Sequence, residues 1–167
     1  MDYANFIKKL ELPAGFTAPA ELVYEDLAIR ALARAHLHDD VRGINASIDL
    51  IRETRGGPWP AEPVTEDFDF VDLVWHELEF RDATSFAYAV YGPGDEYLGC
   101  CYLYPMGHRT ELSEERLAYD VDVSWWVTPD AYARGYYAKL YRALRRWTTE
   151  EFPFHAPYYS NAEIPSD

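Results

Sequence analysis

Asp120, Asp122 and Arg134 are the residues of this chain whose positions best suit chemistry. Asp120 and Asp122 lie two apart in an alternating segment, so in a strand their carboxylates would share one face and could accept a proton or bind an amine. Alternating polar residues on the half-wet face of a sheet give the same pattern, so both interpretations stay open. Arg134 stands beside Gly135 before an amphipathic helix, where it could neutralise a diphosphate or remain a solvated loop charge.

The amino-terminal half predicts one strand followed by two helices. Residues 22–31 alternate loosely, as a strand does, whereas residues 35–54 carry isoleucines at helical spacing. The run Gly-Gly-Pro-Trp-Pro at 56–60 predicts a loop within the domain, because neither helix nor strand tolerates it well. A second helix is expected to begin at 65–67. Its apolar residues recur at three- and four-residue steps: Phe68, Val71, Val74, Trp75 and Leu78.

The carboxyl-terminal half predicts a hairpin, a long strand, a helix and one more short strand. Aromatic and β-forming residues at 85–91 and 97–104 flank turn-forming residues and predict an antiparallel hairpin. Residues 118–127 alternate cleanly as a strand, and residues 155–161 could form another. Between them, from about residue 135, an apolar stripe at helical spacing predicts a helix. The stripe consists of Tyr137, Leu140, Tyr141, Leu144 and Trp147.

This order, β-α-α-β-β-β-α-β, predicts an α/β domain with a mixed, mostly antiparallel sheet flanked by helices. A chain of 167 residues fits a single domain, here 1–167, with 1–20 as an N-terminal extension and a core at about 22–161. The aromatic residues of the long strand, Trp125 and Trp126 among them, are expected in the core.

Composition narrows the partners and the location. The formal charge of −14 repels phosphate backbones and anionic membranes, so neither nucleic acid nor a membrane is expected as a partner. No run of about 18 apolar residues occurs, and the first residues lack the apolar stretch of a signal peptide. We therefore expect a cytoplasmic protein.

The cysteines and histidines predict no metal site. Cys100 and Cys101 are adjacent in a predicted strand, so their side chains point to opposite faces and are expected to stay reduced. The histidines have no convincing metal-ligand spacing. His76 and Glu77 could border a substrate groove, and an exposed polar helix face is the simpler interpretation.

The segment from the long strand through Pro129 and Gly135 into the following helix resembles the GNAT superfamily of N-acetyltransferases, and the similar layout spans roughly residues 22–161. The family signature Q/R-x-x-G-x-G/A falls on this segment with Tyr132 at the Q/R place and Tyr137 at the last small position. Only Gly135 matches it unchanged.

The resemblance implies acetyl-coenzyme A as co-substrate, without a metal. It places the pantetheine arm on the backbone of Trp125 and Val127 and the pyrophosphate on Arg134, Gly135 and Tyr136, where a helix start offers unpaired N–H groups and a positive dipole end.

For catalysis, some family members carry a glutamate at a place that falls on or near Val121, which cannot act as a base. Asp122 is the candidate base instead. Tyr159, with its neighbour Tyr158, is the candidate for the family's tyrosine acid.

The predicted function is acetyl transfer from acetyl-coenzyme A to an unidentified small-molecule or peptide amine. A homodimer is compatible with the sequence. The alternative is a GNAT-like domain without catalysis that binds a small ligand or a partner, which the altered signature favours.

Overall fold

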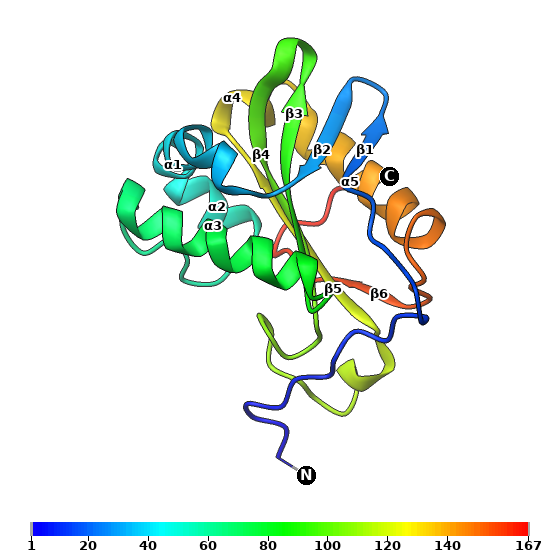
Figure 1. Ribbon diagram of the computed structural model, residues 1–167. Helices are drawn as coiled ribbons and strands as arrows, with labels where there is room; N and C mark the ends of the chain where they lie inside the picture. Colours follow the sequence, from blue (N-terminus) through cyan, green and yellow to red (C-terminus); the bar gives the residue numbers. More distant parts are fainter. Residues whose placement is uncertain (1, 167) are drawn as a thin grey trace.

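The structure is a computed structural model that describes residues 2–166, and it has three layers (Figure 1). Within these residues, one sheet of six strands runs in sequential order; the first five strands are antiparallel, and the last is parallel to the fifth. The strands are β1 Glu21–Tyr24, β2 Leu27–Ala31, β3 Phe86–Gly92, β4 Glu96–Tyr104, β5 Val121–Val127 and β6 Pro157–Tyr159. The α-helices are α1 Leu37–Ala46, α2 Ile48–Thr54, α3 Glu66–Arg81, α4 Pro129–Ala133 and α5 Tyr136–Glu150.

The sheet separates two hydrophobic cores. α5 covers one face, where Trp125 stacks on Tyr141 with ring centroids 5.2 Å apart. α1, α2 and α3 cover the other face, where Trp126 is fully buried. The α/β class, the mixed sheet and the apolar stripe of α5 are thus as predicted. No helix among residues 2–166 is both long and apolar enough to cross a membrane.

Two predicted elements are each divided in the structure. The predicted strand 22–31 is a hairpin of β1 and β2, because Glu25 adopts a left-handed backbone with φ of 52° and reverses the chain. The predicted helix 35–54 breaks at Ser47, whose hydroxyl donates to the Gly43 carbonyl at 2.6 Å. A side chain that bonds its own helix backbone in this way favours a bend.

Three of the five apolar residues that predicted α3 do not face the core. Phe68, Val71 and Trp75 are 65%, 55% and 59% exposed, whereas Asp69 and Leu73 are buried. The helix itself is confirmed, and Thr65 caps it by accepting the Phe68 N–H at 3.2 Å. Periodicity therefore predicted the helix, while polar contacts made by its inner face decided its orientation.

β5 is buried on both faces. Asp122, Ser124 and Trp126 have no exposed surface, because α1 to α3 cover this side of the sheet. The interpretation of these residues as the half-wet face of a sheet is therefore wrong. The strand begins at Val121; Asp120 lies before it and accepts the backbone N–H groups of His155 and Ala156 at 2.7 and 3.1 Å. Asp120 thus fixes the approach to β6.

The two cysteines are placed as predicted. Cys100 and Cys101 are unbridged and buried on opposite faces of β4. Burial raises the pKa of both thiols, so neither is ionised near neutral pH.

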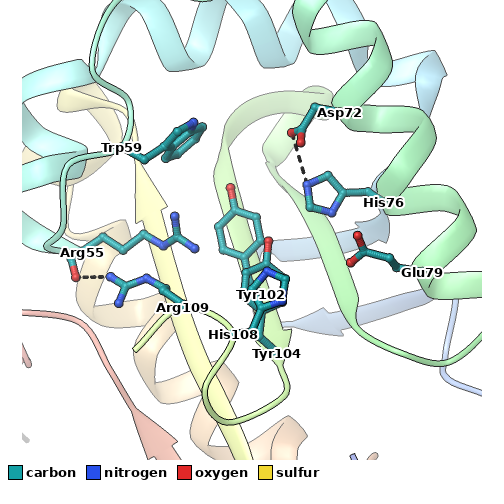
Figure 2. A pocket seen from close by; sticks show the side chains of 9 residues that line it. All are labelled: Arg55, Trp59, Asp72, His76, Glu79, Tyr102, Tyr104, His108 and Arg109. Carbon is teal, nitrogen blue, oxygen red and sulfur yellow. Dashed lines mark hydrogen bonds and ion pairs between the residues drawn. The ribbon is translucent and has the colours of Figure 1, made fainter. Parts of the chain in front are cut away.

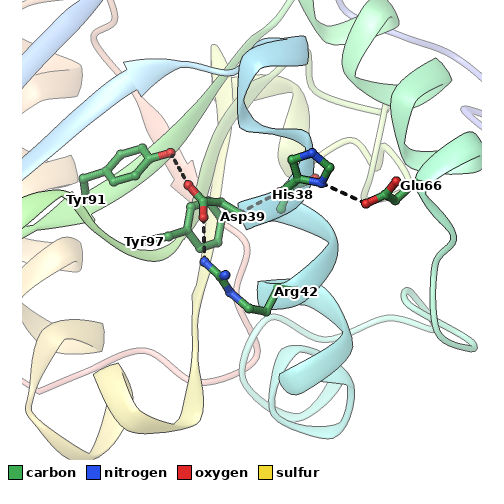
Figure 3. A network of polar contacts seen from close by, with 7 residues as sticks. His38, Asp39, Arg42, Glu66, Tyr91 and Tyr97 are labelled. Carbon is green, nitrogen blue, oxygen red and sulfur yellow. Dashed lines mark hydrogen bonds and ion pairs between the residues drawn. The ribbon is translucent and has the colours of Figure 1, made fainter.

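Polar contacts of α1 connect it to the sheet and to α3 (Figure 3). Asp39 accepts the Tyr91 hydroxyl at 3.1 Å and a guanidinium N–H of Arg42 at 2.6 Å, and His38 contacts Glu66 at 2.8 Å. These contacts hold the first turns of α1 and α3 beside each other.

A pair of buried carboxyl groups lies beneath this network. Asp40 on α1 accepts the Tyr97 hydroxyl at 2.6 Å, and Asp69 on α3 faces Asp40. Burial, followed by the contact with Asp40, raises the pKa of Asp69 to about 9. Asp69 is therefore protonated near neutral pH, and the pair carries less charge than its two carboxyls suggest.

Replacing Asp69 by asparagine tests this pair. The native state keeps Asp69 protonated while the unfolded chain ionises it near its usual value of 3.8, so wild-type stability falls as pH rises from about 4 to about 9. Asparagine cannot ionise. We therefore compare the melting temperature of Asp69→Asn with that of wild type at about pH 5 and about pH 8. The difference, variant minus wild type, should be larger at pH 8 by more than about 3 °C, the effect of roughly 1 kcal/mol in a chain of this size.

The matched control is Asp67→Asn, which changes an exposed carboxylate of the same helix. It should show no pH-dependent gain. Equal behaviour of the two variants in thermal melts would contradict the protonation of Asp69.

Candidate functional site

A pocket of about 320 Å³ opens on the face of the sheet that α1 to α3 cover (Figure 2). α3 provides one wall, β4 provides two tyrosines, and the segments after α2 and after β4 provide the remaining side. Figure 2 shows Arg55 and Trp59 on one side, facing Asp72, His76 and Glu79 across the pocket. The lining residues are Arg55, Trp59, Asp72, His76, Glu79, Tyr102, Tyr104, His108 and Arg109.

Two arginines form the cationic side of the pocket. Arg55 is 7% exposed, donates from Nε to the Ser124 hydroxyl at 3.1 Å, and holds its guanidinium carbon 4.3 Å from the centre of the Tyr102 ring. Arg109 donates to the Arg55 carbonyl and to the Ser160 hydroxyl. Burial, and then the charge of Arg55, lower the pKa of Arg109 to about 10, so it remains protonated near neutral pH.

The opposite side of the pocket comes from consecutive turns of α3. His76 Nε2 lies 3.3 Å from Asp72 Oδ2, and His76 Nδ1 is buried without a hydrogen-bond partner among residues 2–166. Glu79 accepts the Ser85 hydroxyl. The interpretation of His76 as part of an exposed helix face is wrong, since its side chain is only 11% exposed. Glu77 points away from the pocket and pairs with Arg34 at 2.8 Å.

The edge of β5 opposite β4 is only partly paired, and a second pocket of about 320 Å³ lies at the start of α5, lined by Tyr132, Gly135, Tyr137 and Glu163 among others; the edge and this pocket together are termed the groove. The Thr128 N–H donates to the Leu98 carbonyl at 2.8 Å, and in an antiparallel ladder the backbone groups of alternate residues then face opposite edges. Trp125 and Val127 consequently direct their N–H and C=O groups away from β4. β6 pairs only with residues 121–123, so it leaves this part of the edge uncovered.

Asn161 covers the first part of that edge. Its Oδ1 accepts the Trp125 N–H at 3.1 Å, and its Nδ2 donates to the Trp125 carbonyl at 3.0 Å. The next two residues donate their N–H groups to the carbonyls of Arg55 and Thr54 at 3.1 and 2.9 Å. The backbone of Trp125, predicted to bind pantetheine, is therefore engaged, whereas no residue in 2–166 bonds Val127 along this edge.

The start of α5 keeps part of the predicted anion site. Gly135 has a φ of 87°, and no atom lies within 4 Å of a Cβ built on it, so the space before the helix is open. The first N–H groups of α5, including that of Tyr136, have no acceptor within the helix. Tyr137, at the last position of the signature, turns inward and is 4% exposed, with its hydroxyl donating to the Glu163 carbonyl at 2.5 Å.

Charged side chains of the chain itself surround this helix start. Arg134 pairs with Glu96 at 2.6 Å and with Asp130 at 2.9 Å, so its charge is already balanced. The Glu163 carboxylate accepts the Tyr132 hydroxyl at 2.8 Å. Coenzyme A therefore fits the groove only in part in this arrangement: Val127, Gly135 and the helix start are open to it, while Trp125 and Arg134 are engaged.

Asp122 and Tyr159, the predicted catalytic pair, lie on opposite faces of the sheet. Asp122 is buried on the pocket side, where it accepts the hydroxyls of Thr110, at 2.8 Å, and of Ser160. Tyr159 packs against α5, with its hydroxyl 3.2 Å from that of Thr148. The structure does not bring the two side chains to one site.

Sequence analysis missed the residues that shape the pocket and the groove. Arg55 precedes the loop at 56–60, Arg109 lies in the polar segment after β4, and Asn161 follows β6. No motif marks them, because they belong to segments far apart in the sequence that meet only in the folded protein.

Comparison with known proteins identifies the family. A family model described as an acetyltransferase (GNAT) domain matches residues 26–163, so the chain belongs to the GNAT acetyltransferases. None of the curated proteins matches the sequence.

Solved structures of GNAT enzymes have a similar fold at low sequence identity. RimL, a ribosomal L7/L12 alpha-N-protein acetyltransferase in complex with coenzyme A, has a TM-score of 0.59 and 11% identity over 78% of this chain and 69% of its own. A putative ribosomal-protein-serine acetyltransferase from Vibrio cholerae has a TM-score of 0.58 and 11% identity over 81% and 70%. The spermidine N-acetyltransferase from Vibrio cholerae, in complex with CoA and spermine, has a TM-score of 0.51 and 19% identity over 76% and 66%.

Hydrogen exchange can test the bond between Asn161 and the edge of β5. Asn161→Ala removes the acceptor of the Trp125 N–H, so exchange of the Trp125 amide should accelerate by about tenfold, as expected from the loss of roughly 1.4 kcal/mol of protection. Asn45 is a matched control, because its carboxamide bonds the N–H and C=O of Val64 in the same way. Asn45→Ala should accelerate Val64 and leave Trp125 unchanged; an unchanged Trp125 rate in Asn161→Ala would refute the contact.

Proposed function

We propose that this protein transfers an acetyl group from acetyl-coenzyme A to an amine bound in the pocket beside α3. The observation that supports this most directly is the position of Arg55, whose side chain lines the pocket while its carbonyl accepts the N–H of residue 162, next to the Asn161 that covers the edge of β5. Arg55 thus connects the pocket to the segment along the edge of β5, as suits a site with two substrates. Membership of the GNAT acetyltransferases and the coenzyme A bound in two similar structures are consistent with the proposal.

The groove would hold the co-substrate through backbone groups. Val127 offers N–H and C=O groups for the amides of the pantetheine arm, and the first N–H groups of α5 next to Gly135 suit the pyrophosphate. The carboxamide of Asn161 now makes the two bonds to Trp125 that a ligand amide would make. Co-substrate binding along the full edge therefore requires residues 161–163 to withdraw.

His76 is the candidate base of the reaction. An amine must lose a proton to attack a thioester, and the acceptor of that proton must reach it directly or through water. His76 lines the pocket and is oriented by Asp72, which contacts its Nε2, whereas its Nδ1 is buried without a hydrogen-bond partner among residues 2–166. Asp122 is a poorer candidate, because it is fully buried and both its oxygens already accept hydroxyls.

The amine itself is not identified by the comparisons. The similar enzymes are described as acting on ribosomal proteins or on spermidine, which share only an amino group. The carboxylates of Asp72 and Glu79 suit a cationic amine, because opposite charges in a partly buried pocket attract strongly.

A second candidate function is ligand binding without acetyl transfer. It is favoured by the contacts of Asn161 with Trp125 and by the Glu163 carboxylate beside Tyr132, which together occupy the groove with the chain's own amide and acid. In this case the pocket would bind its ligand, and acetyl-coenzyme A would not bind.

Titration calorimetry with acetyl-coenzyme A separates the two candidates. Wild type should bind with a dissociation constant in the micromolar range, about −8 kcal/mol, and Gly135→Glu should abolish binding through bulk and like charge at the helix start. Gly15→Glu is a matched control, since Gly15 also has a left-handed backbone, with φ of 80° and open space around it. No binding by wild type at millimolar ligand would favour the non-catalytic function.

Substitution of His76 tests the proposed base. His76→Gln should lower kcat for acetyl transfer by about a hundredfold, the usual contribution of a general base, and should change KM for acetyl-coenzyme A little. His155→Gln, which changes an exposed histidine away from the pocket, should leave kcat unaltered. Steady-state kinetics with an amine acceptor measure both values, and an unaltered kcat in His76→Gln would exclude the role.

A further inference from the structure

We propose that the pocket selects an amine that also carries an anionic group, a carboxylate or a phosphate, which the guanidinium groups of Arg55 and Arg109 bind. This inference rests on the proposed function for the fate of the amine, but recognition of the anion does not depend on acetyl transfer. It follows from three features of the pocket: the arginines, the carboxylate nearest to them, and the opposite wall.

The first feature is that neither arginine has an acidic partner among residues 2–166. Seven other arginines of the chain form an ion pair with a carboxylate within 4.0 Å, namely Arg30, Arg34, Arg42, Arg52, Arg81, Arg134 and Arg146. Among residues 2–166, no carboxylate lies that close to Arg55 or Arg109. The chain has 29 acidic and 15 basic side chains, so an unpaired buried cation is not explained by a shortage of acids.

Neutral groups fix both arginines without balancing their charge. Arg55 donates to the Ser124 hydroxyl and lies over the Tyr102 ring, and Arg109 donates to backbone carbonyls and to the Ser160 hydroxyl. Each guanidinium has five N–H donors, so donors remain on both. Burial of like charges side by side is unfavourable unless an anion joins them, and this cost is visible in the lowered pKa of Arg109.

The second feature is that Asp122 compensates this charge only in part. Its negative charge favours the charged form of Arg109, but its two oxygens accept hydroxyls rather than guanidinium groups. Two guanidinium groups and one carboxylate leave this side of the pocket with a net positive charge. A carboxylate or phosphate of a ligand would supply the missing charge and the missing acceptors.

The third feature is the opposite charge of the other wall. Asp72 and Glu79 project from α3 toward the arginines across the pocket (Figure 2). A ligand with an amine at one end and an acid at the other meets opposite charges at both walls, whereas a diamine of the same length places a cation against the arginines. Tyr102 and Trp59 provide aromatic surface for the carbons between the two ends.

Calorimetry without acetyl-coenzyme A tests the inference on the full chain. The probes are 4-aminobutyrate and lysine for the carboxylate, 3-aminopropylphosphonate for the phosphate, and butylamine and 1,4-diaminobutane as amines without an acid. At least one acidic amine should bind ten or more times as tightly as butylamine, about 1.4 kcal/mol. Comparison of the carboxylate and phosphonate probes then identifies which anion is preferred. Equal affinities, tighter binding of 1,4-diaminobutane, or no binding of any acidic amine at millimolar concentration would overturn the inference.

Arginine variants assign the preference to the two side chains. Arg109→Gln should remove most of the tenfold preference while butylamine binding stays unchanged, and Arg109→Lys, which keeps the charge, should retain part of it. Arg42→Gln is the control, because Arg42 is an exposed arginine outside the pocket. Retention of the full preference in a folded Arg109→Gln protein, judged by its melting temperature, would contradict the assignment.

Transfer assays with the same probes keep this inference separate from the proposed function. Selective binding of an acidic amine without its acetylation would refute acetyl transfer and leave the anion site intact. Acetylation of butylamine as efficient as that of the acidic amines would refute the preference for an anionic group and support acetyl transfer.

Discussion

The burial of β5 on both faces is the constraint on which the rest of the structure depends. Trp125 and Trp126, adjacent in the chain, are both fully buried, one against α5 and the other beneath α1 to α3. A strand in this position must satisfy its backbone groups laterally, because no water reaches it from above or below. β4 satisfies one edge along its length, whereas β6 and Asn161 share the other.

The two substrate regions of the proposed enzyme follow from this arrangement. Among residues 2–166, the edge that β6 leaves open is where an extended ligand could pair with the backbone of β5. The side chains of Asp122 and Ser124 project from the same strand toward the pocket. Arg55 joins the two regions, since Ser124 holds its side chain and residue 162 bonds its carbonyl. A change on one side of Arg55 is therefore expected to affect the other.

The electrostatics of the pocket differ from those of the chain as a whole. The protein carries a formal charge of −14, yet the guanidinium groups of buried Arg55 and half-buried Arg109 lie together beside the buried Asp122, without an ion pair to a carboxylate among residues 2–166. Charged groups are retained in such places only where other groups compensate the loss of hydration. Here the compensation by neutral hydrogen-bond acceptors, one aromatic ring and Asp122 is incomplete, which is why a ligand anion suits this wall.

Local sequence patterns predicted the types and the order of most elements of the fold. Examples are the apolar stripe of α5, the hairpin of β3 and β4, and the alternation of β5. The sequence also located Gly135 at the start of a helix, because a left-handed backbone before a helix favours glycine. Three features could not be predicted locally and depend on the packed fold: Phe68 and Trp75 face outward, Asp122 is buried, and Asn161 reaches Trp125. Those outcomes depend on contacts between residues far apart in the chain, and local periodicity contains no information about which distant side chains meet.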